Sequence, residues 1–433
     1  MNKNKINWVA VLTMMFLFGM ISFVTNLAAP IGVIWKQAPG IDGSNFWGMM
    51  GNMMNFLAYL FMGIPAGKLI ANLGYKKTTL IGVAVGFCGV FIQYLSGKVG
   101  VGATLANLPA NFFVYLLGAF ICGFSVCILN TVVNPMLNLL GGGGNKGNQL
   151  VQIGGTFNSL TGTLTPMLIG ALIGAVTVET KIADVNTVLY IAMGVFASVF
   201  AILIFVPFVE PEQDKNNTSI KVLLPYRHLI FGVIAIFLYV GVEIGIPAFL
   251  LNFLADSSDK GAGLDPNVAA SIAGSVAAMY WLLMLCGRFT SSFISGKVSS
   301  RTQLSVTSAV AIVLVICSMF TQEISINMPV LKSLTEGFAV MSLPLSALLL
   351  ILCGLCTSVM WGTIFNLSVE GLGKYTALAS GLFMAMVVGG GVLPLVQGVV
   401  ADSVSYMSSY WVIVAGLAFI LWFAVLGSKV KKA

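Results

Sequence analysis

Twelve long apolar stretches run through this sequence, separated by short polar segments. A helix needs about 20 mainly apolar residues to cross the hydrocarbon core of a membrane. Within that core only helices and closed barrels satisfy every backbone hydrogen-bonding group. The sequence therefore predicts an all-α membrane protein with twelve transmembrane helices. The predicted spans are residues 8–35, 46–72, 78–95, 111–140, 150–176, 187–208, 228–255, 266–295, 302–321, 344–368, 375–401 and 407–426.

The scarcity of charge excludes a water-soluble protein. Of 433 residues, 58% are hydrophobic and only 8% are charged, whereas an ordinary soluble domain has about 25% charged residues. The net charge of +7 comes from Lys and Arg residues scattered singly or in pairs, so no basic patch indicates nucleic-acid binding. The first apolar stretch is longer than the apolar region of a signal peptide, about 7 to 15 residues, and we expect it to be retained.

A polar linker, residues 209–226, divides the spans into six and six. We therefore expect an N-terminal six-helix bundle over residues 1–208 and a C-terminal one over residues 227–433. The spacing of Gly63, Lys77 and Thr78 recurs at Gly287, Arg301 and Thr302, which indicates two pseudo-symmetric bundles. In such repeats a site at mid-membrane is exposed alternately to the two sides.

The distribution of Lys and Arg predicts the orientation, because cytoplasmic loops carry the excess. With the amino end inside, fourteen of these residues fall on the inner side and five in outer loops, while Lys68 and Arg288 lie near the inner ends of their spans. We expect a multi-pass protein of the inner membrane with both termini in the cytoplasm, acting as a monomer.

Glu243 is the only one of fourteen acidic residues that falls within a span away from its ends. A charged side chain at that depth costs about 2.5 to 3.5 kcal/mol on insertion scales. Two functional interpretations are open, a proton carrier or an acceptor for substrate hydroxyls. The alternative is a hydrogen-bonded acid that only ties its helix to a neighbour.

Uncharged polar and aromatic residues within the spans suggest a sugar site. Carboxamides offer donors and acceptors that complement a polyol, and aromatic rings can stack on a sugar, although an Asn in a span can also serve interhelical bonding alone. Asn52, Asn55 and Trp281 belong to this mid-span group. The predicted substrate-binding residues are Asn26, Asn130, Asn134, Asn158, Tyr239, Glu243, Asn252, Trp361 and Asn366, with Glu243 also the predicted proton-coupling residue.

No enzyme, cofactor or metal site is expected. The chain has one histidine, His228, and lacks a GxxxxGK[ST] phosphate loop. Its seven cysteines lie within apolar stretches and have no neighbouring histidine cluster, so they indicate packing residues.

Six motifs carry a resemblance to a known family. They are NFLAYLFMGIPAGKLIANLGYKK (residues 55–77), LNTVVNP (129–135), TFNS (156–159), FLYVGVEIG (237–245), GRFTSSFIS (287–295) and TIFNLSVEGLGKYTALASG (363–381), which the GGG at 389–391 follows. With them the chain resembles the fucose/proton symporters of the major facilitator superfamily. The resemblance implies the major facilitator fold and uptake of a monosaccharide with a proton, by alternating access.

The chain departs from that family's pattern at two proton-handling positions. Asn26, before LAAP, stands where the family has an acid, and Asn130 stands where it has a glutamate. Since amides cannot titrate, we predict that proton coupling has moved to Glu243. The alternatives are a facilitator, a sodium-coupled carrier of an amino sugar or nucleoside, a drug exporter of the same superfamily, or a membrane-embedded sensor.

Overall fold

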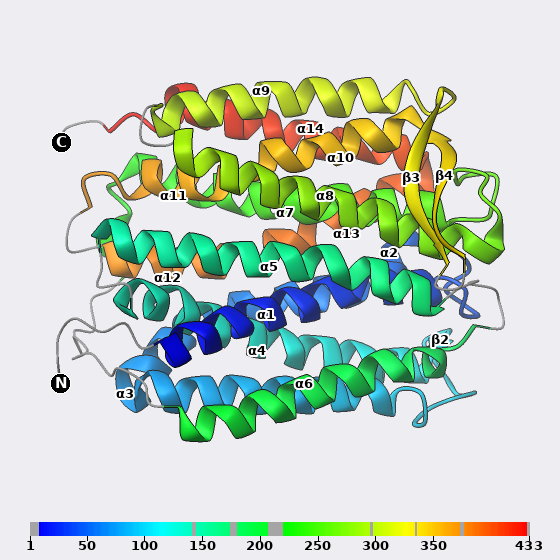
Figure 1. Ribbon diagram of the computed structural model, residues 1–433, viewed down its shortest axis with the longest axis horizontal. Helices are drawn as coiled ribbons and strands as arrows, with labels where there is room; N and C mark the ends of the chain where they lie inside the picture. The colour runs from blue at the N-terminus through cyan, green and yellow to red at the C-terminus, as the bar shows by residue number, and fades with distance from the viewer. Residues whose placement is uncertain are drawn as a thin grey trace.

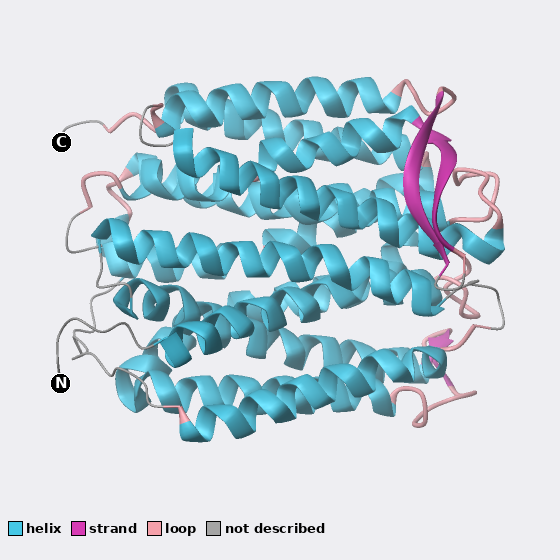
Figure 2. Cartoon of the chain, viewed as in Figure 1, coloured by secondary structure: helices cyan, strands magenta, loops and turns pink. Residues whose placement is uncertain are grey.

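The computed structural model describes residues 8–140, 144–173, 180–206, 220–294, 298–333, 336–372 and 376–430. Long helices run side by side along its longest axis (Figure 1). The start of α1 and the end of α14 lie at one end of the molecule, which we call the termini end. The hairpin of β3 and β4 lies at the opposite end, which we call the hairpin end; Figure 2 shows that helix dominates everywhere else.

The helices and strands divide by sequence into two halves. The N-terminal half contains α1 (Trp8–Trp35), α2 (Asn45–Gly48), α3 (Met50–Leu95), β1 (Thr104–Leu105), β2 (Leu108–Pro109), α4 (Ala110–Leu140), α5 (Gly144–Ile173) and α6 (Asn186–Phe205). The C-terminal half contains α7 (Arg227–Ala255), α8 (Pro266–Ile294), α9 (Ser300–Met319), β3 (Ser325–Ser333), β4 (Gly337–Pro344), α10 (Leu345–Thr357), α11 (Met360–Val369), α12 (Thr376–Met386), α13 (Gly389–Ser403) and α14 (Tyr406–Trp422).

Eleven helices within the described residues are long and apolar enough to cross a membrane. They coincide with all the predicted spans except the fifth. The second and third spans form one continuous element, α3, which is broken at Gly74, where a φ of 80° departs from helical geometry. The tenth span consists of α10 and α11, and the eleventh of α12 and α13.

The fifth predicted span corresponds to α5, a 30-residue helix that is rich in Thr, Asn and Gly. Residues 174–176 of that prediction lie outside the described part of the chain. The exposed side of α5 is an apolar stripe at helical spacing, and its polar side chains face neighbouring helices. The stripe comprises Ile153, Phe157, Leu160, Leu164, Leu168 and Leu172. This pattern fits a membrane helix with one face on lipid and the other on protein, and the prediction of twelve spans is confirmed.

The segment between α9 and α10, which separates the ninth and tenth predicted spans, forms an antiparallel β-hairpin. Leu331 fixes the hairpin to α8 through its backbone. The Ser271 hydroxyl donates to its carbonyl and its N–H donates to Ser275 Oγ, both at 2.9 Å. Met328 and Val330 of β3 and Leu343 of β4 are buried.

Four helix pairs make the main contacts between the two halves. α5 packs along α8, α3 packs against α12 and α13, and α2 packs against α13. Figure 1 shows α5 and α8 as the neighbouring helices at the centre of the view. The cavity described below lies at this interface between the halves.

Close helix contact at Gly123 gives a first prediction. A Cβ at Gly123 of α4 would lie 2.0 Å from the Asn55 carbonyl oxygen of α3, whereas a Cβ at Gly194 of α6 meets nothing within 4 Å. Overpacking costs about 1–3 kcal/mol. We expect Gly123→Ala to lower the thermal unfolding temperature in detergent and Gly194→Ala to leave it unchanged or raised. Equal unfolding temperatures for the two variants would contradict the packing.

Candidate functional site

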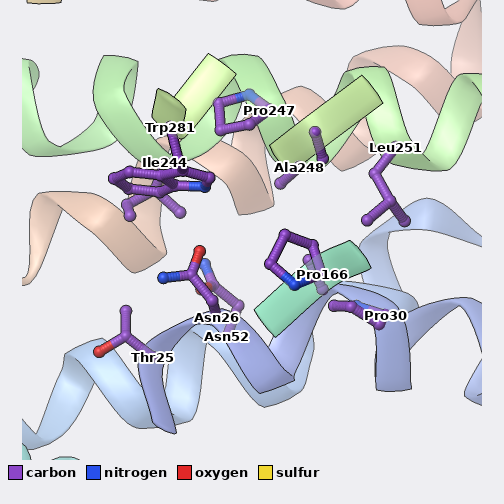
Figure 3. A pocket seen from close by; sticks show the side chains of 12 residues that line it. Thr25, Asn26, Pro30, Asn52, Pro166, Ile244, Pro247, Ala248, Leu251 and Trp281 are labelled. Atoms are coloured by element: carbon purple, nitrogen blue, oxygen red, sulfur yellow. The ribbon is translucent and has the colours of Figure 1, made fainter. Parts of the chain in front are cut away.

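A cavity lies between the two halves (Figure 3). Its wall combines residues of α1, α3, α5, α7 and α8, so both halves contribute. The lining residues are Thr25, Asn26, Ala29, Pro30, Asn52, Pro166, Ile244, Pro247, Ala248, Leu251, Ala277 and Trp281.

The polar part of the wall comes from the N-terminal half, and a large aromatic ring faces it. The Asn26 carboxamide points from α1 toward Trp281 of α8 (Figure 3). Asn26 donates to the Ser22 carbonyl oxygen at 2.9 Å, and Asn52 donates across the interface to the Gly390 carbonyl oxygen at 2.8 Å. An amide edge opposite an indole suits a small polyol, because carboxamides can bond hydroxyls and an aromatic ring can cover C–H groups.

Beside the cavity, Glu243 of α7 forms an ion pair with Arg288 of α8. The distance from Arg288 Nη2 to Glu243 Oε1 is 3.2 Å, and the two side chains are 20% and 12% exposed, respectively. Arg288 lies seven residues beyond Trp281 toward the termini end, about 10 Å along the helix. Each charge thus has the partner that an ionised group within a membrane requires.

Arg288 also connects the two halves. Its Nη1 donates to Ser159 Oγ at 2.9 Å and to the Gly155 carbonyl oxygen at 3.3 Å, both in α5. The flat guanidinium therefore holds Glu243 on one edge and the N-terminal half on another, a geometry that the fork of an Arg side chain permits. Any change in the charge of Glu243 acts directly on a contact between the halves.

Aromatic residues surround the acid. Tyr239, one turn before Glu243, is fully buried and donates to the Thr357 carbonyl oxygen at 3.2 Å. The Trp361 ring meets it edge-to-face with centroids 6.2 Å apart. The helix turn before Glu243 is therefore packed with buried aromatic surface.

Of the nine predicted site residues, only Asn26 lines the cavity, while Tyr239, Trp361 and Glu243 gather beside it. The other five amides bond elsewhere or face outward. Asn130 donates to the Tyr59 hydroxyl at 2.7 Å, Asn134 to the Asn130 carbonyl, Asn158 to the Phe18 carbonyl and Asn252 to the Ala248 carbonyl, and Asn366 is exposed on α11.

Five polar or aromatic residues of the site were absent from the predicted set, and of these Thr25 had received no role. Asn52 and Trp281 had been recognised only as mid-span polar and aromatic residues, and Ser159 within TFNS received no role. Arg288 was placed near the inner end of its span. The sequence does indicate that Arg288 lies inside the membrane span, because the predicted span continues for seven residues beyond it, about 10 Å of helix.

Comparisons with known proteins agree with this architecture. The sequence model of the Major Facilitator Superfamily matches residues 9–387. A glucose/galactose transporter of Brucella abortus biovar 1 (strain 9-941) is 30% identical over 384 residues, which cover 86% of this chain and 84% of that protein. An L-fucose-proton symporter of Escherichia coli (strain K12) is 21% identical over 376 residues, which cover 80% and 77%, respectively. A crystal structure of the E. coli fucose:proton symporter superposes with a TM-score of 0.67 at 19% identity and covers 98% of this chain and 100% of that one.

Proposed function

Because the chain belongs to the major facilitator superfamily, we propose that it is a permease that takes up a monosaccharide by alternating access. The relatives named as glucose/galactose transporter and L-fucose-proton symporter support this substrate class. The cavity between the halves supports it too, since amides face an indole across a space lined by both halves. We propose that residues 1–208 and 227–433 act as the two moving bundles.

We further propose that the termini end is cytoplasmic and the membrane is the inner one. Fourteen Lys and Arg residues belong to the side that carries the termini and five to the other, which is the bias that orients membrane proteins. The hairpin end then faces the periplasm. We expect the protein to work as a monomer, since each chain contains both bundles and the cavity.

The ion pair of Glu243 and Arg288 carries the proposal of proton coupling. A proton taken up by the Glu243 carboxylate converts it to a neutral carboxyl and removes the ionic attraction to Arg288. Arg288 keeps its charge-assisted bonds to Ser159 and Gly155 of the other half but loses the ionic attraction to Glu243, so the balance between the two halves changes. Since Asn26 and Asn130 cannot titrate, Glu243 is the acid we assign to this step.

The central test is transport by the purified protein in liposomes. We expect D-glucose, D-galactose or L-fucose to accumulate when an inward proton gradient is imposed, and accumulation to stop when a protonophore collapses it. If accumulation stops only when an ionophore collapses a sodium gradient, the coupling ion is sodium and not the proton. Failure of every monosaccharide to enter, together with export of amphiphilic dyes, would favour the drug-exporter alternative.

We narrow the proposed sugar contacts to Asn26, Asn52, Thr25 and Trp281. Loss of one hydrogen bond to a bound polar group costs about 1–3 kcal/mol, which is about 5-fold to 150-fold in affinity. We therefore expect Asn26→Ala to weaken sugar binding at least about 5-fold in a thermal-shift titration. Asn267→Ala, at an exposed position at the start of α8, is the matched control and should bind as the parent does. Equal affinities for the two variants would exclude Asn26 from the site.

A further inference from the structure

A second polar cluster joins the two halves at the hairpin end. Its side chains come from the turn after α1, from α2, and from the ends of α7, α13 and α14, which meet beyond the cavity. We call it the outer latch. It comprises Lys36 and Asn45 of the N-terminal half with Asp256, Asp402 and Tyr406 of the C-terminal half.

Asp402 accepts four hydrogen bonds from the other half. Ser44 Oγ donates to its Oδ2 at 2.7 Å, and the backbone N–H groups of Asn45 and Phe46 donate at 2.6 and 3.0 Å. The Asn45 side chain adds a fourth bond at 3.0 Å. Hydrogen bonds to a carboxylate are roughly twice as strong as those between neutral groups. One acid of α13 thus holds the start of α2.

The backbone of α13 lies against the same segment. A Cβ at Gly398, one turn before Asp402, would lie 2.9 Å from the Phe46 backbone nitrogen. There is therefore no room for a side chain between α13 and the start of α2. The four bonds of Asp402 form only while the halves are this close.

Lys36 forms the other part of the outer latch. It is only 4% exposed, and its Nζ donates to Asn45 Oδ1 at 2.9 Å and to the Tyr406 hydroxyl at 2.6 Å. The Tyr406 hydroxyl in turn donates to Asp256 Oδ2 at 2.6 Å, and Lys36 Nζ lies 3.9 Å from that oxygen. The lysine of one half is thus bonded to a tyrosine and an acid of the other.

The Lys36 ammonium remains charged at neutral pH. Burial lowers its pKa from 10.5 to about 8, against the attraction of Asp256 and Asp402, which raises it. The charged form therefore still predominates at pH 7. A buried charge that loses its partner is strongly destabilising, so a partly opened arrangement is unfavourable. The outer latch is therefore either closed and dry or open and hydrated.

From this geometry we propose that the outer latch is the periplasmic gate of the transport cycle, closed in this structure, and that it must open for sugar to reach the cavity. The proposal rests on the proposed function for its orientation and its cargo. The gate can be tested without any sugar, since the proposal predicts only whether the cavity is accessible from the hairpin end.

The test measures access to a cysteine in the cavity wall. In a variant with its seven native cysteines replaced by serine and its uptake retained, Ala29→Cys places a thiol on the cavity wall of α1, seven residues before Lys36. A charged, membrane-impermeant maleimide is added from outside to right-side-out vesicles, and the labelling rate is compared across variants.

We expect Asp402→Ala to raise the labelling rate at least about tenfold, since it removes all four acceptor bonds. Tyr406→Phe deletes one hydroxyl and should raise the rate less. The control Asp259→Asn removes an acid that is exposed in the α7–α8 loop at the same end, and it should label at the parent rate. Parent-like rates for Asp402→Ala and Tyr406→Phe would overturn the proposal.

Two features keep the outcome interpretable. Elution as a monodisperse peak in size-exclusion chromatography checks the fold of each variant, and Tyr406→Phe alone decides the test should Asp402→Ala fail to fold. Because labelling requires no sugar, unchanged labelling rates in the Asp402 and Tyr406 variants contradict only the proposed gate and not the proposed function. A failure of sugar uptake by the parent protein contradicts the proposed function alone.

Discussion

Glu243→Gln is expected to abolish uphill sugar accumulation while leaving sugar exchange intact. Glutamine keeps the size of the side chain and an oxygen that accepts from Arg288, so the ion-pair site stays filled. It cannot bind and release a proton. The variant should therefore still cycle with sugar bound on both sides but have no means of using a proton gradient.

The size of the effect follows from the driving force. A gradient of 100 mV is worth about 2.3 kcal/mol per elementary charge, which supports roughly 50-fold accumulation. In Glu243→Gln liposomes the inside-to-outside ratio should fall to about one, with counterflow of labelled sugar retained. Glu370→Gln, which changes an exposed acid at the end of α11, should accumulate sugar normally. Undiminished accumulation by Glu243→Gln would move the coupling step to another residue.

Arg288→Leu is expected to cause the largest loss of stability. The substitution leaves the Glu243 carboxylate without its ionic partner and also removes the bonds to Ser159 and Gly155. Removing one partner of a buried ion pair costs about 3–5 kcal/mol, because the other charge stays uncompensated. Thermal unfolding of the purified variant should therefore begin at a clearly lower temperature than that of the parent.

A second substitution separates lost pairing from lost packing. The double variant Glu243→Gln with Arg288→Leu has no unpaired charge, so it should unfold at a higher temperature than Arg288→Leu alone. If the double variant is no more stable than the single one, the pair contributes through shape and not through charge. Arg288→Lys adds a further comparison, because lysine keeps the charge but lacks the fork that reaches Glu243 and Ser159 together.

The helical framework was predictable because the membrane imposes it. Span length and apolarity are local properties, and they located eleven helices directly. They also located α5, whose sequence is more polar because the side opposite its exposed apolar stripe contacts protein. The hairpin between α9 and α10 was not predicted. Its strands combine buried residues such as Met328 and Val330 with exposed ones such as Phe338, and α8 determines which face is covered.

The candidate site was predictable in part, because composition reveals which residues are unusual and not what they contact. Glu243 stood out as an acid far from any span end. Its partner did not, because an arginine near a helix end is ordinary in a membrane protein. The amides illustrate the same difficulty, since Asn252, which does not line the cavity, has the same sequence signature as Asn26, which does. Only the arrangement of the helices separates them.

The β-hairpin has a practical consequence for imaging this transporter. A 45.8 kDa protein with most of its mass inside a detergent belt gives electron microscopy few features for aligning particles. Phe338 and Val340 of β4 are each 70% exposed, and β4 pairs with β3, which Leu331 anchors to α8. An antibody fragment raised against that strand would hold a rigid marker on the C-terminal half, and its tilt between particle classes would report how far that half turns.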